Sequence, residues 1–119
     1  MLRFDDLRRA NQTRQAEWPG NEKADVAFRA LEVAGEAGEV AEAVKKYLRG
    51  ERGIGGNVGT VDDVAREIAD VVISLDLLAD ALGIDMANAV RRKFNATSAK
   101  YGLLTTIEPS FVEVQDDPS

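Results

Sequence analysis

The stretch "VDDVAREIADVVISLDLLADAL", residues 61–82, decides the fold class. Its apolar residues recur in steps of three and four over about six turns, which is the spacing of one face of an α-helix. We expect this stripe to be a core face of a helical domain. Its members are Val61, Val64, Ile68, Val71, Leu75, Leu78 and Leu82.

Three more helices are predicted around this one. Short side chains with an oxygen acceptor stand just before three of the helical segments, where they can cap free backbone N–H groups. These N-cap candidates are Asp25, Thr60 and Asp85. The four predicted helices cover about residues 4–17, 26–49, 61–82 and 86–101. Since no strand alternates with these helices, we expect an all-α, four-helix bundle-like fold.

The chain is short enough for one domain, which we place at residues 1–102, followed by a loosely ordered C-terminal tail at 103–119. Within the tail, residues 111–114 are the one strand-like segment. The stretch "GERGIGGNVG", residues 50–59, holds five glycines in ten positions. That composition predicts a mobile connection between two helices.

Composition excludes several classes of protein. The net charge of −6 argues against binding to a nucleic acid polymer or to a membrane surface, because both need a basic patch. The chain has no cysteine and no histidine, so disulfides, thiolate sites and imidazole sites are absent. No apolar run approaches the length of a membrane span. We expect a soluble, cytoplasmic protein.

Acidic residues form a stripe on each of two predicted helices. Each stripe spans a sector of about 60° and borders the apolar stripe of its own helix. The acids therefore lie along the edge of a seam that is expected to be buried. The members are Glu32, Glu36 and Glu39 on the first of these helices and Asp63, Glu67 and Asp70, with Ser74, on the second.

Two facing acidic stripes need a cation between them, because buried like charges repel and lose hydration. All available ligands are oxygen atoms, which favours Mg²⁺, with Mn²⁺ as a substitute. A di-iron centre is excluded because it requires histidine. A solvated acidic surface is the alternative. Gly35 and Gly38, between the acids, would let a neighbouring helix or a phosphate approach the backbone.

Four short segments resemble the MazG-like all-α nucleotide pyrophosphohydrolases, relatives of dimeric dUTPases, dCTP pyrophosphatases and phosphoribosyl-ATP pyrophosphohydrolase. The family pattern is Glu-x-x-Glu, a spacer and Glu-x-x-Asp, which reads here as Glu36-x-x-Glu39 and Glu67-x-x-Asp70. The resemblance covers about residues 24–102. Its segments are "EAGEVAEA" (36–43), "EIADVVISL" (67–75), "LGID" (82–85) and "KFN" (93–95).

The resemblance implies Mg²⁺-dependent hydrolysis of a (d)NTP between its α and β phosphates, for cleansing or control of the nucleotide pool. The four acids of the pattern would hold the metal, and one of them could act as general base. It also implies a dimer or a dimer of dimers, with sites near the subunit interface. On the fourth helix, Lys93 and Asn95 would bind phosphate oxygens and sugar, with Lys100 and Tyr101 as further candidates.

The first helix carries two amides in an otherwise apolar stripe. Asn11 and Gln15 follow Phe4 and Leu7 in steps of three and four, and Trp18 completes the series. Inward-facing amides need hydrogen-bond partners, which are either the edge of a nucleotide base or neighbouring backbone groups. The dimeric dUTPase branch is similar in placing amides and a tryptophan around the base.

A different class of function is a non-catalytic helical module for assembly or regulation, built on the same bundle. The complete set of acids, combined with Lys93 and Asn95, favours the enzyme. A binding module has no use for a divalent-cation site beside a phosphate-binding lysine.

Overall fold

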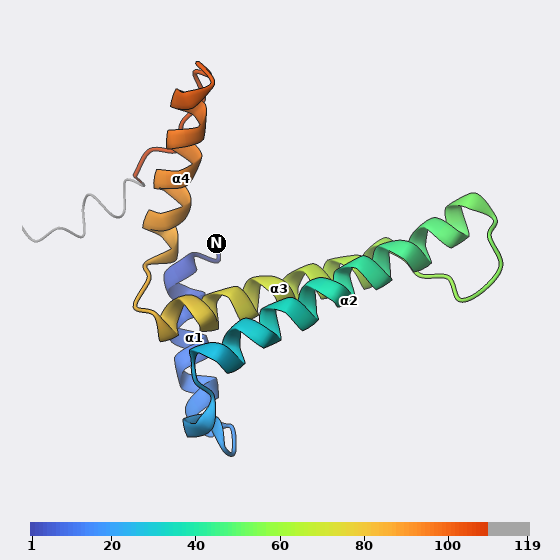
Figure 1. The fold of residues 1–119 in the computed structure, drawn as a ribbon, viewed down its shortest axis with the longest axis horizontal. Helices are drawn as coiled ribbons and strands as arrows, with labels where there is room; N and C mark the ends of the chain where they lie inside the picture. Colours follow the sequence, from blue (N-terminus) through green and yellow to red (C-terminus); the bar gives the residue numbers. More distant parts are fainter. Residues whose placement is uncertain (110–119) are drawn as a thin grey trace, which may run out of the picture. The chain divides into compact units, whose positions relative to one another are not determined.

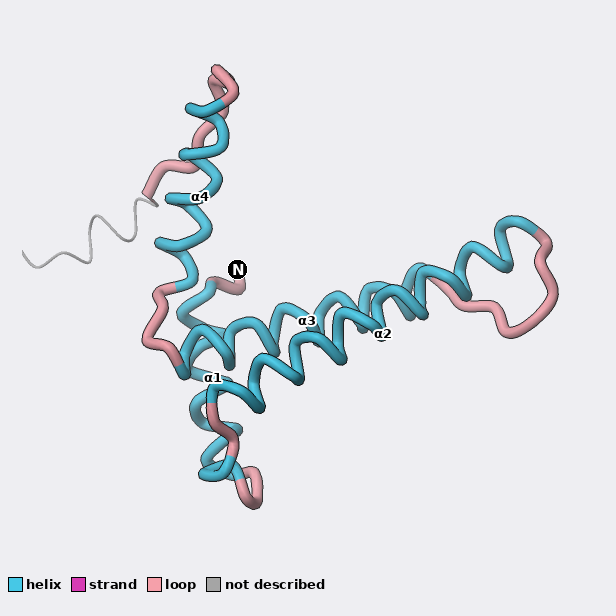
Figure 2. The backbone as a smooth tube through the Cα atoms, in the orientation of Figure 1, coloured by secondary structure: helices cyan, strands magenta, loops and turns pink. Residues whose placement is uncertain are grey.

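Four α-helices and one short 3-10 helix make up the regular structure of residues 1–109, the part of the chain that the computed structural model describes (Figures 1 and 2). No strand occurs within these residues, which confirms the all-α class. The strand-like segment 111–114 lies outside the described residues. The elements are α1 (Phe4–Glu17), η1 (Asn21–Lys23), α2 (Val26–Arg52), α3 (Val61–Ala81) and α4 (Met86–Lys100).

The predicted N-caps are present on α2, α3 and α4. In each, a side-chain oxygen accepts a hydrogen bond from the backbone N–H three residues ahead, which satisfies one free donor of the first turn. These local interactions explain why the helix starts agree with the prediction. The bonds are Phe28 N–H to Asp25 at 2.9 Å, Asp63 N–H to Thr60 at 3.1 Å and Asn88 N–H to Asp85 at 3.1 Å.

The α2 helix is longer than predicted. It continues through Gly50 and ends at Arg52, so residues 50–52 belong to the helix and not to the connection. Gly53 takes the left-handed conformation (φ 66°), and its N–H reaches back to the carbonyls of Arg49 and Gly50. One glycine within a helix costs only about 1 kcal/mol, whereas a left-handed cap requires a residue like glycine. Gly53, and not Gly50, therefore ends the helix.

Contacts within the chain divide it into two units, Met1–Ile84 and Asp85–Ser119. In the first unit α2 runs along α3, and α1 packs against α3 (Figure 1). No helix within residues 1–109 is both long enough and apolar enough to cross a membrane. The proposed division into a domain at 1–102 and a tail at 103–119 stays a prediction.

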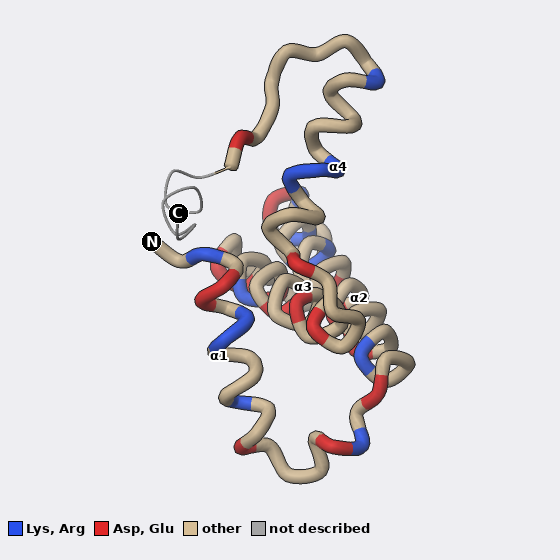
Figure 3. The backbone as a smooth tube through the Cα atoms, turned by 90° about the vertical axis from the view of Figure 1, so that its left-hand side faces the viewer, with Lys and Arg blue, Asp and Glu red and all other residues tan. Residues whose placement is uncertain are grey.

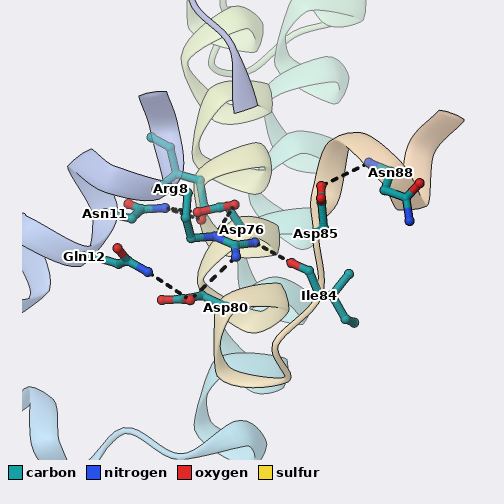
Figure 4. A network of polar contacts seen from close by, with 9 residues as sticks. Arg8, Asn11, Gln12, Asp76, Asp80, Ile84, Asp85 and Asn88 are labelled. Carbon is teal, nitrogen blue, oxygen red and sulfur yellow. Dashed lines mark hydrogen bonds and ion pairs between the residues drawn. The ribbon is translucent and has the colours of Figure 1, made fainter. Parts of the chain in front are cut away.

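A polar network fastens α1 to α3 (Figure 4). Asp76 is buried, at 1% exposure, and accepts hydrogen bonds from Arg8 at 3.0 Å and from the Asn11 amide at 3.0 Å. The same amide also donates to the backbone carbonyl of Ile73 at 3.3 Å. Arg8 donates further to the Ile84 carbonyl at 2.8 Å, so it also holds the end of α3. These hydrogen bonds link α1 to α3.

The apolar stripe of α3 is not the core face that its spacing predicts. Val61, Ile68 and Leu82 are 64%, 49% and 54% exposed. The residues that α3 buries are instead Ser74, Asp76 and Ala79. Ser74 and Asp76 lie on nearly opposite sides of α3, which has contacts with both α2 and α1, and the residues of the apolar stripe are exposed or half-buried. As the core of a single chain, the prediction was wrong.

The second unit contains α4 and the residues that follow it. The helix ends at Lys100, and Gly102 takes the left-handed conformation with φ 66°. The Asn95 side chain pairs with the backbone of Ile107, donating to its carbonyl at 2.9 Å and accepting from its N–H at 2.7 Å. The chain after α4 is therefore tied back to the helix.

Candidate functional site

Three of the four predicted metal ligands meet between α2 and α3. Glu36 on α2 and Glu67 and Asp70 on α3 each offer a carboxylate oxygen, and these oxygens lie within 4.8 Å of one another. The first two residues are half-buried and Asp70 is exposed. Because Glu67 and Asp70 are separated by three positions, they share a face of α3, and α2 brings Glu36 to that face. We call these three residues the acid cluster.

The acid cluster is negatively charged, and Figure 3 shows acidic positions on both helices. Burial raises the pKa of the Glu36 carboxyl above its ordinary value, and the charges of Asp70, Glu67, Glu39 and Glu32 raise it further. Within residues 1–109, no lysine or arginine forms an ion pair with a member of the cluster. No ion pair within the described residues therefore compensates the negative charge of the cluster.

The fourth predicted ligand, Glu39, lies next to the acid cluster. It lines a hollow of about 410 Å³ together with Glu67, which belongs to both the hollow and the cluster. Asn57, Val58 and Gly59 of the α2–α3 connection also line this hollow, as does Lys46. The connection thus borders the predicted metal site.

A second hollow, of about 380 Å³, adjoins the acid cluster on its other side. We call it the α1–α2 pocket, because its lining comes from the end of α1, from η1 and from the start of α2. Gln15 and Trp18, two predicted base contacts, line this pocket, and so does Glu36. Trp18 is 62% exposed, so its ring is open to a ligand. A molecule in this pocket can reach the acid cluster through Glu36.

Asn11 has a different environment from Gln15. Its amide is used within the fold, on Asp76 and on the Ile73 carbonyl. The protein itself therefore satisfies Asn11, through the backbone carbonyl that the second alternative expected and also through the Asp76 side chain, which it did not. The Gln15 oxygen accepts from Arg29 at 3.0 Å, but its NH₂ group has no hydrogen bond within residues 1–109.

Sequence reasoning missed Arg29 and Asn21. Arg29 is buried, at 7% exposure, and lines the α1–α2 pocket together with Asn21, whose side-chain oxygen accepts from it at 2.6 Å. The guanidinium also donates to Glu32 at 2.8 Å. The spacing offered a signal for Arg29, because it precedes Glu32 by three positions and Glu36 by seven. A cation in line with the acidic stripe was therefore visible in the sequence.

The candidates from the fourth predicted helix all lie in the second unit. Asn95 uses its side chain on the Ile107 backbone. The Lys100 ammonium lies 5.4 Å from the centre of the Tyr101 ring, a cation–π distance. Lys93 is exposed. The roles of these four residues toward a nucleotide stay predictions.

Gly35 and Gly38 face open space. A Cβ atom added at either position would meet no atom within 4 Å outside the local backbone of α2. No other helix within residues 1–109 therefore approaches these glycines. The expected approach of a phosphate to the backbone at these glycines stays a prediction.

Comparison with known proteins assigns the chain to a family. A family model described as the MazG nucleotide pyrophosphohydrolase domain matches residues 28–101, which is more than half of the chain. The matched segment contains the acid cluster and Glu39. Among curated proteins, no match to the chain was found.

Proposed function

Because the chain belongs to the MazG nucleotide pyrophosphohydrolase family, we propose that it hydrolyses a nucleoside triphosphate between the α and β phosphates, releasing a nucleoside monophosphate and pyrophosphate. One observation carries the proposal. The acid cluster, which has no cationic partner within residues 1–109, shares Glu36 with the α1–α2 pocket. A metal–triphosphate group and a base therefore have adjacent places. Cleansing or control of the nucleotide pool is the proposed purpose.

The acid cluster fits a hard divalent cation. It offers three carboxylates and no nitrogen or sulfur ligand, which is the donor set that Mg²⁺ prefers and that Mn²⁺ accepts. Glu36, Glu67 and Asp70 would hold the ion, and Glu39 is the fourth proposed ligand. A bound ion neutralises phosphate charge and lowers the pKa of a coordinated water.

The residues around the acid cluster have separate proposed roles. The Trp18 ring forms a stacking surface for the base, and the Gln15 amide meets its edge. One carboxylate of the set accepts the proton of the attacking water as general base. From the second unit, Lys93 and Asn95 bind phosphate oxygens and sugar, with Lys100 and Tyr101 in support. The expected cytoplasmic location stays a prediction.

We also propose that the chain forms a homo-oligomer, either a dimer or a dimer of dimers. Val61, Ile68, Leu75 and Leu82 belong to one face of α3 and are exposed. Apolar residues gathered on one helix face in this way mark an interaction surface. Sedimentation at micromolar concentration should give at least a dimer, and a stable monomer would contradict this part of the proposal.

One assay tests the activity directly. The purified protein is incubated with each of the common dNTPs and NTPs in the presence of Mg²⁺, and the released pyrophosphate is measured. We expect release from at least one nucleotide and none when a chelator is added. If no nucleotide yields pyrophosphate, the result favours the alternative of a non-catalytic assembly or regulatory module.

A further inference from the structure

One buried arginine orients two amides at the α1–α2 pocket. The same guanidinium nitrogen of Arg29 donates to the side-chain oxygens of Gln15, at 3.0 Å, and Asn21, at 2.6 Å. Its other terminal nitrogen donates to Glu32 at 2.8 Å, which holds the guanidinium plane in place. Arg29 is almost wholly buried, whereas both amides line the pocket.

This arrangement dictates which way each amide faces. An arginine side chain can only donate hydrogen bonds, so Gln15 and Asn21 must both turn their oxygen atoms toward it. Their NH₂ groups are then directed away from Arg29, and neither has a hydrogen bond within residues 1–109. No buried side-chain nitrogen in the described part of the chain lacks a partner, so these NH₂ groups are at least partly exposed. Because both residues line the pocket, their NH₂ groups are the donors that a ligand there would meet.

The rest of the pocket suits a flat ring that is attached to a phosphate chain. Trp18 and Phe28 are exposed aromatic residues in its lining, and their rings can stack on a base. Glu36 links the pocket to the acid cluster, where the triphosphate is proposed to bind. With the phosphates held there, the edge of the base farthest from the phosphates is the part that reaches the two amides.

Building on the proposed function, we propose that Gln15 and Asn21, oriented by Arg29, select nucleotides with a carbonyl oxygen at this outer edge. That oxygen is at position 4 of a pyrimidine or position 6 of a purine. A carbonyl oxygen has two lone pairs and can accept from both NH₂ groups. An amino group at the same position is itself a donor, so it cannot accept from the two NH₂ groups and leaves them without a partner. Arg29 is a positioning residue in this scheme.

The first experiment compares pairs of nucleotides in which one has a carbonyl at this position and the other has an amino group. We measure kcat/KM by pyrophosphate release for dUTP against dCTP and for dITP against dATP. The oxo nucleotide of each pair should be preferred by about tenfold or more, because a site that binds a polar group rejects an analogue that leaves its donors unpaired. Equal rates, or a preference for the amino nucleotides, would overturn the inference.

Substitutions locate the cause of the preference. Gln15→Glu keeps an oxygen for Arg29 but replaces the NH₂ donor with an acceptor, so the oxo preference should fall several-fold or reverse. The two nucleotides of a pair carry the same triphosphate, so the effect of the added charge on the phosphates cancels in the ratio. Gln12→Glu is the matched control, since Gln12 is an exposed α1 residue outside the pocket lining. Its amide donates to Asp80 at 3.2 Å, so circular dichroism is used to confirm that this variant is folded. The control should keep the wild-type ratio.

A variant of Arg29 tests the positioning role. Arg29→Lys leaves one nitrogen in place of three, which cannot hold both amide oxygens and Glu32 in the same geometry. In protein shown to be folded by circular dichroism, the oxo preference should fall for both nucleotide pairs. An unchanged ratio in folded Arg29→Lys would remove Arg29 from the scheme and overturn it.

A binding measurement separates this inference from the proposed hydrolysis. Calorimetry without divalent cation compares uridine 5′-monophosphate with cytidine 5′-monophosphate, and the uridine nucleotide should bind more tightly. Tighter binding without pyrophosphate release from any triphosphate would refute the hydrolysis but support the base selection. Hydrolysis with no preference in either measurement would refute the base selection alone. If the protein neither hydrolyses nor binds nucleotides, both proposals fail.

Discussion

The helix α3 carries two groups of acids that are treated in opposite ways. Near its C-terminal end, Asp76 is 1% exposed and accepts hydrogen bonds from Arg8 and Asn11. Nearer its start, Glu67 and Asp70 face another acid, Glu36, across the helix pair, and neither forms an ion pair within residues 1–109. Asp76, which stabilises the fold, has its charge compensated by an ion pair and hydrogen bonds within the chain. A carboxylate without such partners is free to bind a ligand.

The difference arises from the helix that each group faces. The α1 helix presents a cation and an amide donor to Asp76, whereas α2 presents a further carboxylate to Glu67 and Asp70. A buried carboxylate is tolerated only when it is paired and hydrogen-bonded. The carboxylates of the acid cluster have neither an ion pair nor a hydrogen bond within residues 1–109, and they are only half-buried or exposed. The acid of α3 that stabilises the fold is thus a different one from the acids that we propose bind the metal.

The largest expected effect is on catalysis. Asp70→Asn or Glu39→Gln removes an anionic ligand while keeping the shape, so pyrophosphate release should fall by about 1,000-fold or more. The melting temperature should stay the same or rise, because repulsion among the acids is relieved. Asp62→Asn is the matched control, since Asp62 is an exposed acid of the same helix that pairs with Arg66. Wild-type turnover in either ligand variant, with folding confirmed by circular dichroism, would rule out this site.

Asp76→Asn should have the opposite effect, with lower stability and retained activity. Removing the charge breaks the ion pair with Arg8 and should lower the free energy of unfolding by about 3 kcal/mol. Turnover of the remaining folded protein should stay close to that of wild type, because Asp76 lies outside the acid cluster. Urea unfolding measures the loss. A variant that keeps full stability but loses activity would break the comparison.

Metal binding should stabilise only the group of acids without partners. At a Mg²⁺ concentration tenfold above its Kd, the wild-type free energy of unfolding should rise by about 1.4 kcal/mol. The Asp76→Asn variant should gain the same increment, whereas Asp70→Asn should gain much less. Thermal melts with Mg²⁺ and after chelation measure this. An equal gain in all three proteins would show that the ion binds elsewhere.

The smallest expected effect is on stability and concerns Asp63, an acid near the start of α3 that has hydrogen-bond partners within the chain. Its carboxylate accepts the Thr60 N–H at 2.8 Å, and this bond lowers the pKa of Asp63 below the ordinary value of 3.8. As the pH falls, the Asp63 carboxylate is therefore protonated at a higher pH in the unfolded chain than in the folded one. The stabilisation is present above pH 3.8 and is lost as the pH falls through the lower folded value.

Asp63→Asn should accordingly lower the melting temperature slightly at neutral pH. The difference from wild type should shrink below pH 3.8, and paired melts across the acid range would show it. A difference that grew in acid would show that the Thr60 bond does not favour the charged carboxylate. Asp62→Asn again serves as the control, because Asp62 takes no part in this cap.

Several features could be predicted because they depend on neighbours in the sequence. Asp25, Thr60 and Asp85 each cap a helix through a bond that spans three residues. The acidic stripes follow from the helical repeat in the same way. Gly50 shows the limit of such reasoning, since a glycine that suggests a break can continue a helix when Gly53 provides the cap.

Other features needed the arrangement of the helices in space. Which acids of the two stripes meet depends on how far α2 is shifted along α3, and that shift joins Glu36 to Glu67 and Asp70 while Glu39 lines the neighbouring hollow. The burial of Arg29 and its hold on Gln15 and Asn21 depend on three separate elements. The sequence by itself determined the helices, their caps and the acidic stripes, because these rest on interactions within a few residues. Only the tertiary structure decided which acids are paired within the chain and which are not, because that depends on side chains brought together from distant parts of the chain.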